Sequence, residues 1–198
     1  MRSRIAVLAS GMGSNLQAIL EYFGSQAETR SSDVALVVSD RSGSYALERA
    51  RDRNVEALVI PYGDSSALLD ALTSRDIDLV VLAGYLRRLP PEVIARFRNR
   101  IVNIHPGPLP EFGGKGMYGE RVHAAVIQAR LRETAVTVHL VDEEYDRGAT
   151  IAQWPVPVME DDTPASLAQR VLEVEHLMYP RVIDLVLTLN SLNTINSH

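Results

Sequence analysis

The chain has 198 residues, a formal net charge of −5 and no cysteine. Its length is that of one large domain or of two closely joined halves. The lack of cysteine excludes disulfide bonds and thiolate chemistry, and no basic stripe typical of a nucleic-acid binder is visible. No apolar run reaches the roughly 18 residues that a membrane span needs. We therefore expect a cytoplasmic monomer or homodimer that binds neither nucleic acid nor membrane.

The first half of the sequence alternates between strand and helix patterns. Residues 4–9 form a continuous apolar run, which predicts a strand buried on both faces. Residues 15–23 then carry apolar residues at helical spacing, and residues 24–33 form a polar loop. The alternation continues with strands expected over 34–38, 57–60 and 77–83, and with helices over 44–53, around Leu68, Leu69 and Leu72, and over 91–97. This order is typical of a mainly parallel sheet with right-handed crossovers.

The second half of the sequence adds three strands and two helices. Strands are expected over 101–105, 133–141 and 151–158, and helices over 120–130 and from Thr163-Pro164 onward. Pro155 and Pro157 favour an edge position for the last strand, because proline cannot donate to a neighbour. We predict a single α/β domain over residues 1–198 with a mostly parallel, twisted sheet of about seven strands. Helices cover both of its faces, and its half over residues 1–100 is Rossmann-like.

Two polar side chains stand at the end of a predicted buried strand. Asn103 and His105 are two residues apart, so they project from the same face, and Pro106 ends the strand. Strand ends are where α/β proteins place their chemistry, which favours a functional pair. The alternative is a pair of hydrogen-bonded core residues.

A glycine-rich turn follows the first predicted strand. Residues 10–15 read Ser-Gly-Met-Gly-Ser-Asn and lead into a helix, an arrangement that can hold a phosphate on backbone N–H groups. The pattern is neither the Walker sequence nor the full dinucleotide sequence, so it suits a single phosphate better than a pyrophosphate. A tight turn with a Ser or Asn cap and no ligand is the alternative.

An acidic loop precedes the last predicted strand. Asp142, Glu143 and Glu144 are expected to be solvated, whereas Asp146 is the last acid before the strand. If Asp146 reaches His105, we expect it to favour the imidazolium and to raise the pKa of the histidine. His139 is expected to be a structural histidine with satisfied hydrogen bonds.

Several segments together resemble the phosphoribosylglycinamide formyltransferases, which belong to the folate-dependent formyltransferase family. Any one segment is weak, but they occur in order and span almost the whole chain. They are Ala-Ser-Gly-Met-Gly-Ser-Asn-Leu at 9–16, Leu-Ala-Gly-Tyr-Leu-Arg at 82–87, Asn-Ile-His-Pro at 103–106 with Leu109-Pro110, Val-His-Leu-Val-Asp at 138–142 with Asp146 and Gly148, and Glu175-His176.

The resemblance implies transfer of a formyl group from 10-formyltetrahydrofolate, as co-substrate, to the amine of phosphoribosylglycinamide, with no metal. Asn103 and protonated His105 would donate to the oxyanion that develops on the formyl group. Asp146 would keep His105 charged and help relay the proton. Residues 1–100 would then form the phosphate-binding half and residues 101–198 the catalytic and folate-binding half.

The resemblance also implies contacts with each substrate. Gly13, Ser14 and Asn15 would hold the phosphate, and Glu175 would contact the ribose or the glycinamide. Arg147 stands where the family often has glycine, which is expected to alter the path of that loop, and a basic residue common near Ser65-Ser66 is absent. The implied folate contacts are Leu86, Arg87, Arg88, Leu89, Asn103, Val141, Asp142 and Asp146.

Three other functions remain open. Methionyl-tRNA formyltransferase shares the Asn-x-His and Asp motifs but carries an additional RNA-binding domain. Formyltetrahydrofolate hydrolase shares the catalytic trio but carries an N-terminal regulatory domain, whereas here the catalytic fold begins at residue 4. A non-catalytic nucleotide-binding protein is the third, and it would have no need of Asn103, His105 and Asp146 together.

Overall fold

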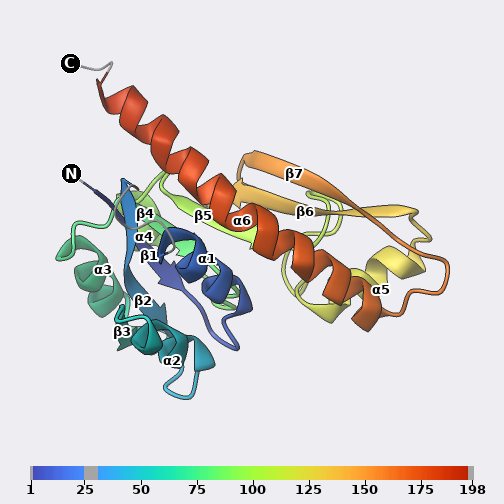
Figure 1. Ribbon diagram of the computed structural model, residues 1–198, viewed down its shortest axis with the longest axis horizontal. Coiled ribbons are helices and arrows are strands. Elements are labelled where there is room, and N and C mark those ends of the chain that lie inside the picture. Colours follow the sequence, from blue (N-terminus) through green and yellow to red (C-terminus); the bar gives the residue numbers. More distant parts are fainter. Residues whose placement is uncertain (1, 25–30, 196–198) are drawn as a thin grey trace.

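The strands expected in the first half lie side by side in a computed structural model, which describes residues 2–24 and 31–195 (Figure 1). They are parallel neighbours in the order β3-β2-β1-β4-β5, which confirms the predicted crossovers. Most of the polar loop expected over residues 24–33 lies outside the described residues. The bounds are β1 (Ser3–Leu8), β2 (Ser32–Ser39), β3 (Glu56–Val59), β4 (Leu79–Leu82) and β5 (Ile101–His105).

Two antiparallel strands extend the same sheet to seven strands. β6 (Glu133–Leu140) pairs with β5, and β7 (Thr150–Pro157) pairs with β6 at the edge. The expected edge position of the last strand is confirmed, because β7 has β6 as its single neighbour. Pro155 and Pro157, which have no N–H to donate, lie on this strand. The predicted α/β class with a mostly parallel sheet is confirmed as well.

Helices cover both faces of the sheet because its central strands are apolar on both sides. Ile5 and Val7 of β1 belong to one core cluster, and Ala6 and Leu8 belong to a second cluster on the opposite face. Residues of α1 (Ser14–Gly24), α2 (Tyr45–Asp52), α5 (Glu120–Gln128) and α6 (Pro164–Ile195) join the first cluster, and residues of α3 (Ser65–Thr73) and α4 (Pro91–Arg96) join the second.

The second face of the sheet changes from apolar to polar at β5. The core under α3 and α4 ends at Ile101, and the next residues on that face of β5 are Asn103 and His105. They stand directly opposite His139 and Thr137 of β6, and opposite residues of antiparallel strands share a face. Polar side chains from two strands therefore gather on one part of the sheet.

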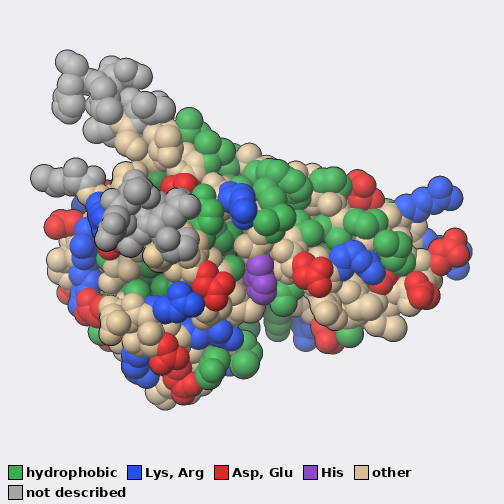
Figure 2. All heavy atoms as spheres, in the orientation of Figure 1, with side chains coloured by type: hydrophobic (Ala, Val, Ile, Leu, Met, Phe, Trp, Pro, Cys, Tyr) green, Lys and Arg blue, Asp and Glu red, His purple; other side chains and the backbone are tan. Residues whose placement is uncertain are grey.

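The long helix α6 crosses the sheet diagonally (Figure 1). The buried Tyr179 hydroxyl lies 2.8 Å from the Leu82 carbonyl and 3.2 Å from the Val102 carbonyl, so it joins α6 to β4 and β5. Figure 2 shows hydrophobic side chains along the outer side of α6, where Leu177 and Leu185 are about half exposed. Among the described residues, no helix has the length and the apolar character needed to cross a membrane.

Candidate active site

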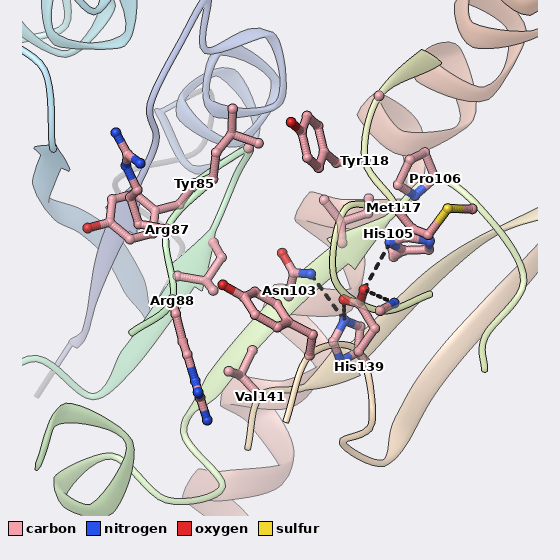
Figure 3. A pocket seen from close by; sticks show the side chains of 18 of the residues that line it. Tyr85, Arg87, Arg88, Asn103, His105, Pro106, Met117, Tyr118, His139 and Val141 are labelled. Carbon is pink, nitrogen blue, oxygen red and sulfur yellow. Dashed lines mark hydrogen bonds and ion pairs between the residues drawn. The ribbon is translucent and has the colours of Figure 1, made fainter. Parts of the chain in front are cut away.

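A cavity of about 530 Å³ opens beside the carboxyl ends of β4 and β5. Asn103, His105 and His139 meet at one side of it, as Figure 3 shows. Asp146 also lines this cavity, as do Asn15 and Glu175 from the opposite side of the sheet. Crossover connections bring the ends of neighbouring parallel strands to one edge, which is where open α/β sheets bind ligands.

Asn103 is held by His139. Its Nδ2 lies 3.1 Å from His139 Nε2, and His139 Nδ1 lies 2.8 Å from the Leu140 carbonyl oxygen. A carbonyl oxygen can only accept, so Nδ1 carries the proton and donates it to Leu140. In the neutral ring Nε2 then has a lone pair, which accepts a hydrogen bond from the Asn103 amide. An amide nitrogen carries two protons, and the second remains available to a ligand in the cavity.

His105 has one nitrogen in a fixed hydrogen bond and one that faces Asp146. The side chain is 3% exposed, and Nε2 lies 2.8 Å from the Phe112 carbonyl oxygen, to which it donates. Nδ1 lies 3.8 Å from Asp146 Oδ2. Because Nε2 holds its proton against a carbonyl, Nδ1 is the nitrogen that gains and loses a proton.

Asp146 raises the pKa of His105 as expected, but the net shift of this pKa is downward. Burial lowers the pKa of this imidazole more than the Asp146 carboxylate and the Phe112 carbonyl raise it, so the pKa lies below its ordinary value of 6.5. A charged imidazolium loses hydration free energy in this buried site. This loss is larger than the attraction that it gains from the carboxylate at 3.8 Å. His105 is therefore neutral near pH 7 in the free protein.

Asp146 is held in place by the Gly114 amide. This amide donates a hydrogen bond of 2.8 Å to Oδ2, while Oδ1 lies 3.5 Å from His139 Nε2. Burial raises the pKa of the carboxyl, but the groups around it lower the pKa by more, so it lies below its usual range. Asp146 is therefore ionised. Its backbone adopts φ +55°, a conformation that costs free energy in a residue other than glycine.

The loop after β6 reaches the site despite Arg147. Arg147 is exposed, and it is not among the residues with positive φ, so this position does not require glycine. Gly148 is the position that does, because a Cβ there would lie 1.9 Å from the Leu140 carbonyl oxygen. Asp146 lies beside His105 with Arg147 at this position, and the expected change in the path of the loop stays a prediction.

Asn15 and Glu175 meet across the cavity from the histidines. Asn15 Nδ2 donates to Glu175 Oε2 over 2.7 Å and so connects the start of α1 to α6. Burial raises the pKa of Glu175 from its ordinary value of 4.5 to about 7, and the Asn15 hydrogen bond opposes this only in part. Between pH 4.5 and about pH 7, Glu175 is protonated in the folded protein but ionised in the unfolded chain. The contribution of this carboxyl to the free energy of unfolding therefore falls as the pH rises.

Replacing Glu175 by glutamine is expected to remove that pH dependence. The free energy of unfolding of Glu175→Gln, relative to the native protein, should grow by roughly 3 kcal/mol between pH 4 and pH 8. Urea unfolding at several pH values measures it. Glu173→Gln, at an exposed position on the same helix, is the control and should show no such trend. A constant difference between Glu175→Gln and the native protein would contradict this prediction.

The glycine-rich turn is tied to α2. The Gly11 carbonyl accepts from the Ser44 hydroxyl over 3.0 Å, and the Met12 carbonyl accepts from Arg49 Nε over 2.9 Å. The first N–H groups of α1 have no partner within the helix and are the donors that a phosphate would use. Asn15 lines the large cavity, whereas Gly13 and Ser14 lie just outside its lining.

Gly13 allows the turn to approach α2. It has φ +68°, and a Cβ there would lie 2.9 Å from the Ala46 Cβ. Gly13→Ala should therefore displace the N–H groups and raise KM for a phosphorylated substrate at least about tenfold. Gly11→Ala is the matched control, because a Cβ at Gly11 meets nothing within 4 Å. Equal KM values in the two variants would exclude this function of the turn.

The other predicted folate contacts also lie around this cavity. Arg87 is held in an ion pair with Asp40 at 2.9 Å. Sequence reasoning missed Gly114, Met117 and Tyr118, whose glycine-rich loop has no periodic pattern. The expectation that His139 is a structural histidine with satisfied hydrogen bonds is confirmed, but the sequence did not show that its partner is Asn103. The predicted residues that line the cavity are Leu86, Arg87, Arg88, Leu89, Asn103, Val141, Asp142 and Asp146.

Across residues 2–24 and 31–195, no group of three or more His, Asp or Glu side chains is arranged to hold a metal ion. The expectation that the reaction uses no metal stays a prediction.

The chain and its fold have counterparts among known proteins. Residues 3–183 match the family described as formyl transferase, and the chain belongs to this family. It is 36% identical to the phosphoribosylglycinamide formyltransferase of Haemophilus influenzae, over 91% of this chain and 85% of that protein. A crystal structure of glycinamide ribonucleotide transformylase 1 from Symbiobacterium toebii has 39% identity and a TM-score of 0.83, and the match covers 92% of this chain and 86% of that one.

A plant relative is longer than this chain. The chloroplastic phosphoribosylglycinamide formyltransferase of Arabidopsis thaliana is 42% identical over 190 residues, which are 92% of this chain. The chain spans 64% of the length of that relative.

Proposed function

We propose that the protein transfers the formyl group of 10-formyltetrahydrofolate to the amine of 5-phosphoribosylglycinamide. The products are formylglycinamide ribonucleotide and tetrahydrofolate, in de novo purine biosynthesis. One observation carries the proposal: Asn103, His105 and Asp146 line the same cavity as Asn15 at the start of α1. The cavity therefore contains both a reacting centre and the start of a helix that can bind a phosphate. The names of the relatives from Haemophilus influenzae and Arabidopsis thaliana support it.

The first step is attack of the glycinamide nitrogen on the formyl carbon. A new C–N bond forms, and the carbonyl electron pair moves to the formyl oxygen. The free N–H of Asn103 donates to this oxyanion, an interaction whose loss commonly costs a factor of about 10² to 10³ in kcat. The amide is ready for this because its other N–H is fixed on His139 at 3.1 Å.

The second step moves one proton from the attacking nitrogen to the leaving nitrogen. Neutral His105 accepts the proton at Nδ1, because Nε2–H stays bonded to the Phe112 carbonyl. The Asp146 carboxylate at 3.8 Å stabilises the imidazolium, which also attracts the oxyanion. The proton then passes to N10 of the folate as the bond between the formyl carbon and N10 breaks. His105 returns to its neutral form.

The two substrates occupy different sides of the cavity in this proposal. Gly13, Ser14 and Asn15 hold the phosphate, and Glu175 takes hydroxyl donors from the ribose or an N–H from the glycinamide. Residues 86–89 and 141–146 enclose the folate ring. The buried side chains of Leu82, Leu89, Ile94 and Ile104 give that part of the cavity an apolar surface, which supports the assignment.

A deformylation assay tests the proposal. Release of the formyl group from 10-formyl-5,8-dideazafolate is followed by absorbance, with and without phosphoribosylglycinamide. We expect release only when the acceptor is present. Equal release without the acceptor would instead assign a hydrolase, and no release under either condition would assign a non-catalytic binding protein.

We also propose that the protein acts in the cytoplasm. Its cysteine-free sequence is compatible with a reducing compartment. The Arabidopsis thaliana relative is named as chloroplastic, so cell fractionation with a chloroplast or membrane marker is the test that separates the compartments.

A further inference from the structure

A buried histidine that the proposed reaction does not use lines the same cavity. His123 lies near the start of α5 and is 3% exposed, yet it lines the cavity together with His105 and Glu175. Within residues 2–24 and 31–195, no group forms a hydrogen bond with its ring. Buried polar groups normally have a partner, so an imidazole without one at the wall of a cavity indicates a ligand.

The two nitrogens of His123 have different surroundings. Nδ1 is enclosed by the protein and has no hydrogen-bond partner. Nε2 is not enclosed in this way and is the nitrogen open to the cavity. A buried N–H without a partner is rarer than a buried acceptor without one, so Nδ1 is the unprotonated nitrogen of the neutral ring. Nε2 therefore carries the hydrogen and presents a donor to the cavity.

The His123 ring is neutral near pH 7. Burial lowers its pKa by more than Glu120 on the same helix raises it, and His105 lowers it as well. Glu175 of α6 is the acid on the neighbouring helix that lines the same cavity. A second proton on the ring would have to occupy Nδ1, where no acceptor is present. His123 is thus a neutral donor rather than a second proton carrier.

His123 lies close to the reacting centre. A Cβ on Gly107 would lie 2.6 Å from Val122, the residue before His123, and 3.5 Å from His105 Nε2. The start of α5 therefore packs against the end of β5. An acceptor whose amine reaches His105 brings its next atoms to the start of α5.

The side of the cavity that contains His123 also contains Glu175. Val126 of α5 shares a core cluster with Leu167 and Val171 of α6, so the two helices form one wall of the cavity. In phosphoribosylglycinamide the amide carbonyl is bonded to the carbon that bears the attacking nitrogen. With the amine at His105 and the phosphate at the start of α1, this carbonyl lies along the wall formed by α5 and α6.

We propose that His123 donates its Nε2–H to the amide carbonyl oxygen of phosphoribosylglycinamide, an inference that rests on the proposed function. This hydrogen bond fixes the plane of the amide and holds the neighbouring amine against the formyl carbon. It makes the enzyme prefer an acceptor that carries the carbonyl oxygen. His123 takes up no proton during the reaction.

A change of one atom in the acceptor tests this assignment. Dissociation constants are measured by calorimetry for phosphoribosylglycinamide and for its thioamide, in which sulfur, a weaker acceptor, replaces the carbonyl oxygen. The native protein should bind the amide about tenfold more tightly than the thioamide. His123→Leu, which has no donor, should bind the two compounds equally. His123→Gln places an N–H near the position of Nε2 and should retain part of the preference, whereas the shorter His123→Asn should lose it.

His176→Leu is the matched control. This histidine also has a nitrogen without a partner, but it lines a different cavity. It should keep the native preference, and loss of the preference there as well would overturn the proposal. An unchanged preference in His123→Leu would overturn it too. If His123→Leu does not fold, the glutamine and asparagine variants decide, and equal preferences in these two would overturn the proposal.

The native protein separates this inference from the proposed function. Equal binding of the amide and the thioamide would overturn the assignment of His123 and leave the proposed function intact. Failure to bind either compound would refute the proposed function and this inference together.

Discussion

Replacing His105 by alanine is expected to lower kcat for formyl transfer about a thousandfold. The imidazole is the group that takes up the migrating proton, and its protonated form stabilises the oxyanion. KM for phosphoribosylglycinamide should change less than about threefold, because the phosphate site at the start of α1 does not contact His105. Steady-state kinetics with each substrate varied in turn measure both effects.

Added imidazole provides a control for His105→Ala. The side chain is buried at 3% exposure, so its removal leaves a space beside Asp146 that a small base can enter. We expect partial recovery of kcat with imidazole and none with an imidazole that is methylated on both nitrogens. A kcat within tenfold of the native value would show that His105 is not the proton carrier.

Replacing Asp146 by asparagine is expected to lower kcat by about 10² to 10³. Asparagine keeps the acceptor for the Gly114 amide but removes the charge that stabilises the His105 imidazolium. The carboxylate raises the pKa of His105 against the effect of burial. Its removal should therefore lower that pKa further and shift the acid limb of the pH profile of kcat/KM to lower pH.

Glu160→Gln is the matched control for Asp146→Asn. It removes one negative charge at an exposed position that does not line the cavity. It should leave kcat and the acid limb unchanged, because solvent screens an exposed charge. If Asp146→Asn lowered kcat without moving the acid limb, Asp146 would position the loop rather than stabilise the imidazolium.

Local patterns were sufficient for most of the fold. The apolar run of β1 and the helical spacing in α1 predicted elements within about two residues of their bounds. The order of strands and helices predicted a parallel sheet, and Pro155 and Pro157 predicted its edge. These features depend on the period of side chains along a chain and on the missing N–H of proline, both of which are properties of neighbouring residues. The last helix begins at Pro164, as expected.

The same local logic reached part of the site. A period of two placed Asn103 and His105 on one face, and the glycine-rich turn marked the start of α1. Asp146 was singled out as the last acid before a strand, and family resemblance added Glu175. The structure places Asp146 beside His105 and Glu175 beside Asn15, at separations of 41 and 160 residues in the sequence.

The chain's own sequence thus determined the elements, the mostly parallel sheet with its last strand at the edge, and the side-chain pair at the end of β5. Tertiary structure alone decided the partners and the charges. His139 became the support of Asn103 because an antiparallel strand places it directly opposite, a register that no single strand encodes. The pKa of His105 falls although a carboxylate lies 3.8 Å away, because burial depends on everything packed around the ring. Arg98, which is 45 residues away in the sequence, pairs with Glu143 for the same reason.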